Sequence, residues 1–292
     1  TFLHEGHGTM VGFVDTDRAG LGPYEWDLRS LLTSTVLQGR ELGLSAQQQD
    51  AALRDAVNAY RDAVTSVAGK DGKEAEDAAK KLRATKDDAP EPLRKMIKAA
   101  EKQDAGEWRD KVLDTSGDGI ALRRREGKLT DIPGTPPGAR EKIIAGIRDA
   151  APRYLASLPK DLREKYEGYT VADVAMPVSG NGSLGYGRYQ AVLVPPGKHP
   201  KSKDALVLEF KEELAPVLPG VPRGLHGGEG QRVVDLFRLA EGAKAEPAWG
   251  SVTLPAGAGV RSNSFFVSDV RPDDVGVDLD KASPHEFTEM VV

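Results

Sequence analysis

The hydrophobic pattern of the chain changes near Tyr169, and this change limits the fold more than any other feature of the sequence. Before it, apolar residues recur at helical spacing, as in the run Leu28, Leu31, Leu32 and Val36. After it, apolar and polar residues alternate between glycine-rich turns, as in VADVAMPV and ALVLEF. The 292 residues can form one large domain or two moderate ones with real cores. We therefore predict an α+β chain with a helical part first and a β-rich part second.

The first part contains several predicted helices. Residues 24–41 form the first, and Ser45 with Gln48 has the spacing of a capping box that starts the next. Lys, Glu and Ala alternate over residues 70–110, which predicts solvated helices of an insertion or a lid. A connector rich in Pro and Gly then leads into a helix over about residues 139–158.

Three segments follow from this pattern. Residues 1–168 form the helical part with its charged insertion, and residues 169–275 form the β-rich part. Residues 276–292 begin a further helix, which Ser283 caps and Pro284 opens. The sequence starts with Thr rather than Met and stops inside this helix, so whether it is a fragment at either end stays open.

Composition removes some classes of function. The net charge is -5 and the isoelectric point is near 5.7, which argues against a general partner of nucleic acids or of anionic membranes. The sequence has no Cys, so disulfides, thiolate catalysis and cysteine-ligated metal sites are excluded within it. No apolar run approaches the roughly 18 residues of a membrane helix.

Two carboxylates, Asp15 and Asp17, end the apolar run Val11–Val14 and are followed by a Gly-Pro turn. They are either solvated aspartates at a strand end or ligands for a divalent cation, which prefers carboxylate oxygens. The stretch alone does not decide between these interpretations.

A glycine-rich loop lies between two apolar strand runs. We call the following residues the glycine loop: Gly180, Asn181, Gly182, Ser183 and Gly185. Such a loop can bring backbone N–H groups close to phosphate oxygens, although a glycine hairpin of a β domain gives the same pattern. A strand rather than a helix follows, which argues against a Rossmann site.

The next predicted strand, LVLEFKEEL, carries Lys211 after an alternating apolar run. A lysine on the strand after a glycine-rich hairpin is the protein-kinase arrangement, in which it neutralises nucleotide phosphates and pairs with a helix carboxylate. Glu229 and Asp235, on the following helix, are the candidate partners. The alternative is a surface lysine among neighbouring glutamates.

Two other motifs carry less weight. DTSGDG begins like a calcium loop, but its twelfth position is Arg125 instead of a glutamate, so a turn is predicted. The basic run from Arg123 to Arg125 is followed at once by Glu126 and is interpreted as a solvated face, with a phosphate contact as the alternative.

Together these segments resemble the uncharacterised bacterial domain of unknown function 2252 family, which is considered kinase-like. The segments that carry the resemblance are DTDRAGLGPYEWDLRSLLTSTVLQGRELGLS, LRRREGKLTDIPGTPPG, VSGNGSLGYGRYQAVLV, LVLEFKEE and GQRVVDLFRLAEG. The resemblance implies a protein-kinase-like two-lobe fold with its usual order rotated, so that the helical large lobe comes first and the β-rich small lobe comes late.

The resemblance also implies a site. Asp15 and Asp17 fall on the acidic pair of the family and are expected to hold Mg²⁺. The glycine loop and Lys211 are expected to bind the phosphates of ATP, with Glu229 as the lysine's partner. The implied partners are a nucleotide and an unknown acceptor, with neither nucleic acid nor membrane, and ATP dependence favours the cytoplasm.

One departure from the family pattern leaves activity open. Family members carry G-D-x-H-x-x-N-F-G before the acidic strand, whereas this chain has TFLHEGHGT, with no aspartate and no asparagine. His4 and His7 can be aligned with the histidine and the asparagine of that pattern, but imidazole is a poor substitute for oxygen ligands of Mg²⁺. No catalytic residue is assigned. The chain is expected to be either an ATP- and Mg²⁺-dependent phosphotransferase, with a small molecule as one candidate acceptor, or a pseudokinase-type binding module without turnover.

Overall fold

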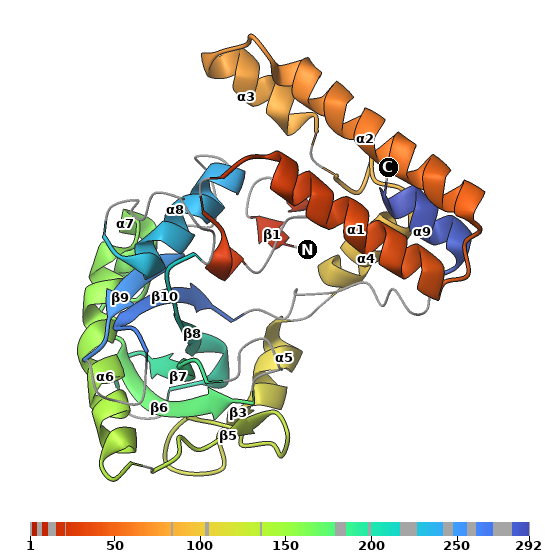
Figure 1. Ribbon diagram of the computed structural model, residues 1–292. Helices are drawn as coiled ribbons and strands as arrows, with labels where there is room; N and C mark the ends of the chain where they lie inside the picture. Colours follow the sequence, from red (N-terminus) through yellow and green to blue (C-terminus); the bar gives the residue numbers. More distant parts are fainter. Residues whose placement is uncertain are drawn as a thin grey trace. The chain divides into compact units, whose positions relative to one another are not determined.

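Helices and antiparallel sheets make up the described part of the chain, as the α+β prediction required (Figure 1). The computed structural model describes residues 2–4, 8–10, 16–20, 22–82, 84–102, 105–134, 136–178, 185–197, 200–216, 227–241, 248–255, 261–270 and 282–291. The chain divides into two units. Unit 1 comprises Thr1–Phe13, Gly22–Gln103 and Asp273–Val292, and unit 2 comprises Val14–Leu21 and Asp104–Pro272.

A six-stranded antiparallel sheet forms the centre of unit 2, in the order β5-β6-β7-β8-β10-β9. Its strands are β5 (Leu129–Thr130), β6 (Thr170–Pro177), β7 (Arg188–Val194), β8 (Leu206–Glu212), β9 (Gly250–Thr253) and β10 (Ser264–Asp269). Successive side chains of a strand point to opposite faces. In β8 the alternation places Leu208 and Phe210 on one face and Glu209 and Lys211 on the other.

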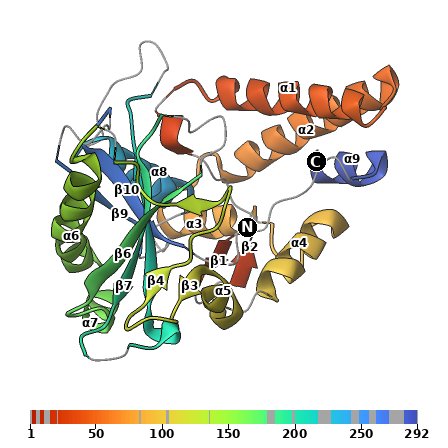
Figure 2. The ribbon, with the colours of Figure 1, turned by 90° about the horizontal axis from the view of Figure 1, so that it is seen from below.

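Each face of this sheet is covered by a helix (Figure 2). Helix α6 (Ala139–Ser157), followed by α7 (Lys160–Lys165), buries Ile147 and Tyr154 against the face that carries Phe210 and Phe265. Helix α8 (Glu229–Glu241) packs Phe237 against the ring of Phe266 on the opposite face. Strand β10 is therefore packed between apolar residues on both faces, through Phe265 on one side and Phe266 on the other, while β8 joins the α6 side through Leu208 and Phe210.

The same face as α8 also carries a small second layer. It consists of α5 (Ala105–Val112), β3 (Leu113–Asp114), β4 (Ala121–Leu122) and the short η3 (Ser202–Asp204). The DTSGDG stretch is the turn between β3 and β4, as predicted. The Asp114 carboxylate accepts hydrogen bonds from the Ser116 N–H and hydroxyl, and these bonds lower the pKa of Asp114.

Arg124, in the middle of the basic run, is a structural residue rather than part of a fully solvated face. Its guanidinium makes a bidentate pair with Asp173 on β6, at 2.5 and 3.1 Å. Asp173 also accepts a hydrogen bond of 2.9 Å from the Leu122 N–H. The pair thus joins the small layer to the main sheet.

Unit 1 contains the helices α1 (Glu25–Glu41), α2 (Ala46–Val67), α3 (Gly72–Lys80), α4 (Glu91–Glu101) and α9 (Pro284–Val291), and the hairpin of β1 (Phe2–His4) and β2 (Gly8–Met10). The predicted capping box is confirmed: Ser45 and Gln48 exchange hydrogen bonds at the start of α2. Ile97 on α4 is fully buried, so part of the charged segment contributes to the core instead of being only a solvated insertion.

The division into units differs from the boundary expected at residue 168. Residues 104–168 and 14–21 belong with the sheet, in unit 2. The reason is that α6 has a strongly apolar face that is buried by the sheet, which its helical periodicity alone did not reveal.

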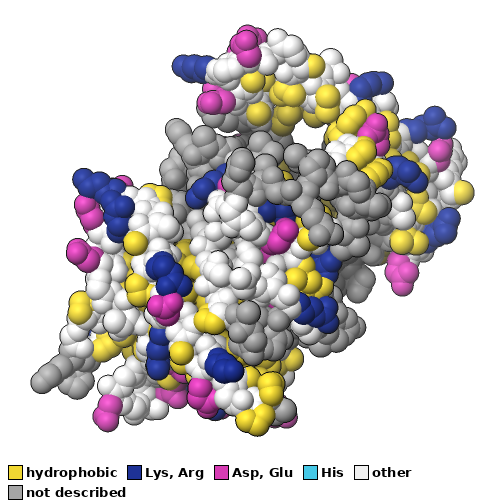
Figure 3. Space-filling model, turned by 60° about the vertical axis from the view of Figure 1, so that its left-hand side comes forward, with side chains coloured by type: hydrophobic (Ala, Val, Ile, Leu, Met, Phe, Trp, Pro, Cys, Tyr) yellow, Lys and Arg dark blue, Asp and Glu magenta, His cyan; other side chains and the backbone are white. Residues whose placement is uncertain are grey.

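The surface is mixed in charge. Basic and acidic side chains are interspersed over the face shown in Figure 3, as expected from 40 Lys and Arg residues against 45 Asp and Glu residues. Within the described ranges, no helix has the length and apolar character that crossing a bilayer requires.

Asp173→Asn should lower the free energy of unfolding by about 2 kcal/mol at neutral pH, because charge-assisted hydrogen bonds are lost. Burial raises the pKa of Asp173, but hydrogen bonds from Arg124 and Leu122 outweigh it and leave that pKa below its usual value. The contribution is therefore complete above the unfolded pKa of about 3.9, and it disappears as the pH falls through the lower folded value.

Urea unfolding at neutral pH and at about pH 3 measures this difference. Asp149→Asn, which removes an exposed pair with Arg153 on α6, is the matched control and should cost about 0.5 kcal/mol or less. An Asp173 effect that is no larger than the control, or that does not shrink in acid, would contradict the assignment.

Candidate functional site

Lys211 lies near the end of β8, in the centre of the sheet, on the face that α8 covers. Its neighbours across the strands are Arg188 on β7 and Phe266 on β10. Like charges directly opposite each other in a sheet repel, so Lys211 and Arg188 both need carboxylate partners. Arg188 has one in Glu209, at 2.9 Å.

The carboxylate partner of Lys211 is Asp17. The Lys211 Nζ and the Asp17 Oδ2 are 2.6 Å apart, and the two side chains are 19% and 25% exposed. Asp17 lies in η1 (Thr16–Arg18), at the opposite end of the sequence. The structure therefore brings together two residues that the sequence assigned to one site.

A buried arginine on α8 holds the Asp17 segment in place. The Arg232 guanidinium is 3% exposed and donates to the carbonyls of Asp17, at 2.6 Å, and of Ala19. It also donates to the Leu214 carbonyl, just after β8, at 2.9 Å. One side chain thus fixes η1 and the end of β8 to the same helix.

The two helix carboxylates predicted as partners of Lys211 accept hydrogen bonds from residues of α8 itself. Glu229 accepts a hydrogen bond of 2.6 Å from the Arg232 Nε and so compensates a buried positive charge. Asp235 accepts one of 2.8 Å from Gln231. Glu229 therefore acts on the site through Arg232, which holds the backbone of Asp17.

A second buried charge, Glu212, fixes the backbone between Tyr186 and β7. Its side chain is next to Lys211 in sequence but on the opposite face of β8, and the residue is 2% exposed. One carboxylate oxygen accepts from the Gly187 N–H at 2.6 Å, and the other accepts from the Ser262 N–H. Burial, with a smaller contribution from the Glu212 charge, raises the pKa of nearby Tyr189 to about 12, so this hydroxyl stays neutral.

Two arginines flank Tyr186, between the glycine loop and β7. The guanidinium carbons of Arg18 and Arg261 lie 5.3 and 5.2 Å from the centre of the Tyr186 ring. Arg18 also donates a hydrogen bond to the Tyr186 hydroxyl. Gly185 has a φ of +80°, and a Cβ there would lie 3.0 Å from the Arg261 Nη2, so glycine permits this approach.

These residues enclose a small pocket in unit 2. It is lined by Asp17, Arg18, Tyr186, Arg188, Lys211, Glu212, Glu213 and Leu214. Its volume of about 20 Å³ is room for about one water molecule. Charges of both signs line it, three cations and three carboxylates.

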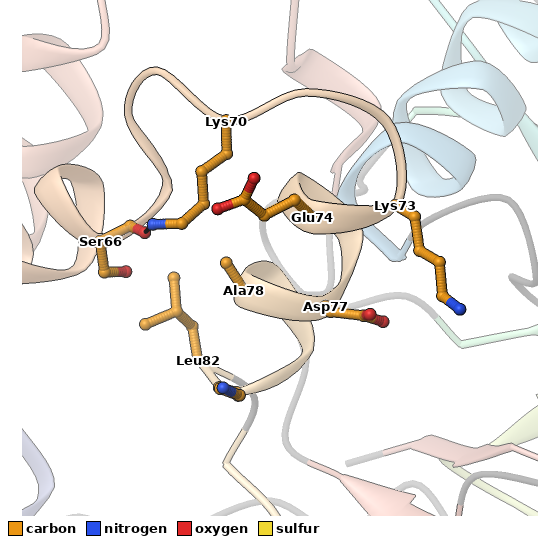
Figure 4. A pocket seen from close by; sticks show the side chains of 8 residues that line it. Ser66, Lys70, Lys73, Glu74, Asp77, Ala78 and Leu82 are labelled. Atoms are coloured by element: carbon orange, nitrogen blue, oxygen red, sulfur yellow. Dashed lines mark hydrogen bonds between the residues drawn. The ribbon is translucent and has the colours of Figure 1, made fainter.

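A larger hollow of about 670 Å³ lies between the end of α2 and α3 in unit 1 (Figure 4). Five of its eight lining residues are charged, and it contains none of the residues that the sequence assigned to a site. Ligand pockets are mostly apolar with a few convergent polar groups, so the charged lining of this hollow differs from that of a typical ligand pocket, and we assign no function to it.

Several predicted site residues lie outside the described part of the chain. They are Asp15, Gly180, Asn181, Gly182 and Ser183. Among the residues that are described, no group of three His, Asp or Glu side chains could hold a metal ion.

The segment aligned with the family's catalytic loop contributes a β-hairpin. Phe2–His4 pairs with Gly8–Met10, and His4 stands opposite Gly8. His7 lies outside the described residues. The described backbone here is strand, so it supplies no residue that we can assign as a general base.

The sequence analysis assigned no role to Arg232 or Glu212, although the sequence position of each one indicates that it is buried. Glu212 follows Phe210 by two positions and so falls in the buried phase of β8. Arg232 follows Glu229 by three positions and precedes the buried Val233 and Val234. A charged residue at a position that the pattern predicts to be buried indicates that it pairs with a group elsewhere in the fold.

Comparisons with known proteins add one finding. The model of a family described as "Uncharacterized protein conserved in bacteria (DUF2252)" matches residues 3–292. No curated protein and no solved structure matches the chain.

Arg232→Ala should lower the free energy of unfolding by about 3 kcal/mol, because it strands the Glu229 carboxylate and three carbonyl groups. Arg238→Ala removes an exposed arginine from the same helix and should cost about 0.5 kcal/mol or less. Urea unfolding of both variants makes the comparison. Equal losses in the two variants would show that Arg232 does not anchor the Asp17 segment.

Proposed function

The chain belongs to the DUF2252 family of uncharacterised bacterial proteins, and on this basis we propose that it is a kinase-like nucleotide-binding protein. In this proposal it uses ATP with Mg²⁺ to transfer phosphate to an unknown acceptor, with small molecules as the first candidates. The sheet of unit 2 corresponds to the small lobe of a kinase and the helices of unit 1 to the large lobe, in rotated order. ATP dependence favours a cytoplasmic location.

One observation carries the proposal: the contact of 2.6 Å between Lys211 and Asp17. Phosphoryl transfer needs a cation against the phosphates and a carboxylate for the metal, placed next to each other. A lysine on a central strand and an acid from a distant segment supply these two charges. Both side chains are mostly buried, which limits screening by solvent.

The size of the pocket indicates how a nucleotide would enter. About 20 Å³ cannot hold a triphosphate beside the ion pair. In the proposed complex Lys211 would bind phosphate oxygens in place of Asp17, and the Asp17 carboxylate would then be available to hold a metal ion. The ion pair between Lys211 and Asp17 then belongs to the free protein, and the negative charge of the ligand replaces Asp17 as the partner of Lys211.

The residues present fit a magnesium ion in part. Asp17 offers a carboxylate 25% exposed, and Asp15 is the second proposed ligand. Bound there, Mg²⁺ would neutralise phosphate charge. Around it the protein's own groups have two tasks: Lys211 binds phosphate oxygens, and Arg232 keeps the backbone of Asp17 fixed.

A second candidate, a pseudokinase-type module that binds nucleotide without turnover, is favoured by one observation. The segment aligned with the catalytic loop pairs as a β-hairpin and presents no aspartate that could act as a base. Binding needs only the phosphate and metal groups, whereas transfer also needs the acceptor hydroxyl to be positioned and deprotonated.

Lys211→Met and Asp17→Asn should each weaken Mg·ATP binding at least about tenfold, because a charge-assisted contact is worth about 1.5–3 kcal/mol. Isothermal titration measures the dissociation constants. Lys203→Met, an exposed lysine in η3, is the matched control and should bind as the parent does. As an independent check, ATP at about 100 times its dissociation constant should stabilise the parent by about 2.7 kcal/mol.

Absence of any ATP binding by the parent would end the proposal, and binding indifferent to both substitutions would place the nucleotide elsewhere. ADP formation with a panel of hydroxylated small molecules then separates the two candidates. Acceptor-dependent turnover that Asp17→Asn abolishes supports the enzyme. Tight binding without turnover supports the pseudokinase.

A further inference from the structure

The positive charges around Tyr186 are not all neutralised by the protein. Lys211 and Arg188 are paired with Asp17 and Glu209. By contrast, Arg18 and Arg261 make no ion pair with a carboxylate among the described residues, and both are exposed. Two guanidinium groups therefore converge on one tyrosine ring, and no carboxylate of the described residues forms an ion pair with either of them.

An anion placed between the two arginines would lower the repulsion between them. Two like charges that share one ring repel, and cation–π attraction at an exposed site offsets only about 0.5–1 kcal/mol for each. Exposed arginines are free to swing into water instead. The position of each arginine at the ring therefore depends on how the backbone beside it is held.

Buried groups hold the backbone beside Arg18, Tyr186 and Arg261. The Glu212 carboxylate accepts from the N–H groups of Gly187 and Ser262, which directly follow Tyr186 and Arg261. The Arg232 guanidinium donates to the carbonyls of Asp17 and Ala19, which flank Arg18. Glu212 and Arg232 are only 2% and 3% exposed, so both anchors are rigid.

The sequence is also adapted to this geometry. A Cβ at Gly185 would lie 3.0 Å from the Arg261 Nη2, and the positive φ of Gly185 disfavours any other residue. Arg18 and Tyr186 line the same pocket as Lys211. Arg18, Tyr186 and Lys211 are thus parts of one concave site, in which Asp17, Glu212 and Glu213 also supply carboxylates, and Arg261 lies beside its tyrosine.

We propose that Arg18, Tyr186 and Arg261 form a clamp that binds a phosphoryl group of the substrate. Guanidinium groups match phosphate oxygens with paired N–H donors, and the Tyr186 hydroxyl accepts from Arg18 while its own proton can be donated to the ligand. The clamp rests on the proposed function, because it is part of the same site. The phosphoryl group belongs either to the nucleotide or to the acceptor.

Titration of the whole chain with inorganic pyrophosphate tests the clamp. The double variant Arg18→Gln, Arg261→Gln should bind pyrophosphate at least about tenfold more weakly than the parent. Replacement of both by lysine should recover only part of the loss, since paired donors and ring stacking are missing. Arg238→Gln, an exposed arginine on α8, should leave the affinity unchanged. Circular dichroism melts confirm that each variant is folded.

Repeating the titration with saturating Mg·ATP distinguishes the two sources. Competition between pyrophosphate and ATP supports a clamp for the nucleotide phosphates. Arginine-dependent pyrophosphate binding that persists with ATP bound supports a clamp for a phosphorylated or similarly anionic acceptor.

The clamp and the proposed function can fail separately. If ATP and pyrophosphate binding depend on Lys211 but not on Arg18 and Arg261, the clamp is refuted and the nucleotide site stands. If pyrophosphate binding depends on the arginines while ATP does not bind at all, the clamp stands and the kinase-like function falls. Equal pyrophosphate affinity in the parent and the double glutamine variant overturns the clamp outright.

Discussion

The ion pair between Lys211 and Asp17 is the contact on which the candidate site of unit 2 depends. It joins a central strand of the sheet to a short segment from the other end of the sequence. It persists because water is largely kept out and because Arg232 fixes the backbone of the Asp17 segment. Without that backbone anchor, ordering the Asp17 segment would cost about 1–2 kcal/mol per residue in conformational entropy, which one partly exposed ion pair could not offset.

Charge balance explains the surroundings of this pair. Alternation along antiparallel strands puts Arg188 directly opposite Lys211, and each has its own carboxylate. The buried Glu212 and Arg232 satisfy backbone groups instead, so they hold loops rather than ligands. The protein thus separates groups that fix geometry, which are buried, from groups that can meet a ligand, which are partly exposed. This division is what preorganised sites for anions require.

Local patterns of the sequence predicted the elements well, because each rests on short-range physics. The capping box of Ser45 and Gln48 and the alternation of β8 are examples. The convergence of Asp17 and Lys211 came from a family resemblance, not from periodicity. The pairing of Glu229 with Arg232 was not foreseen although their spacing permits it, because a helix carboxylate has several cations within reach and the choice depends on which one is buried. The boundary between the two units could not be predicted either, because the apolar face of α6 does not indicate which sheet it packs against.

A double-mutant cycle between Asp17→Asn and Lys211→Met tests the central contact most directly. Free energies of unfolding are measured for the parent, both single variants and the double variant. A real, mostly buried ion pair predicts a favourable coupling energy of about 1 kcal/mol or more, which should decrease little with added salt. Additivity within about 0.3–0.5 kcal/mol would mean that the two side chains do not meet, and would contradict the account.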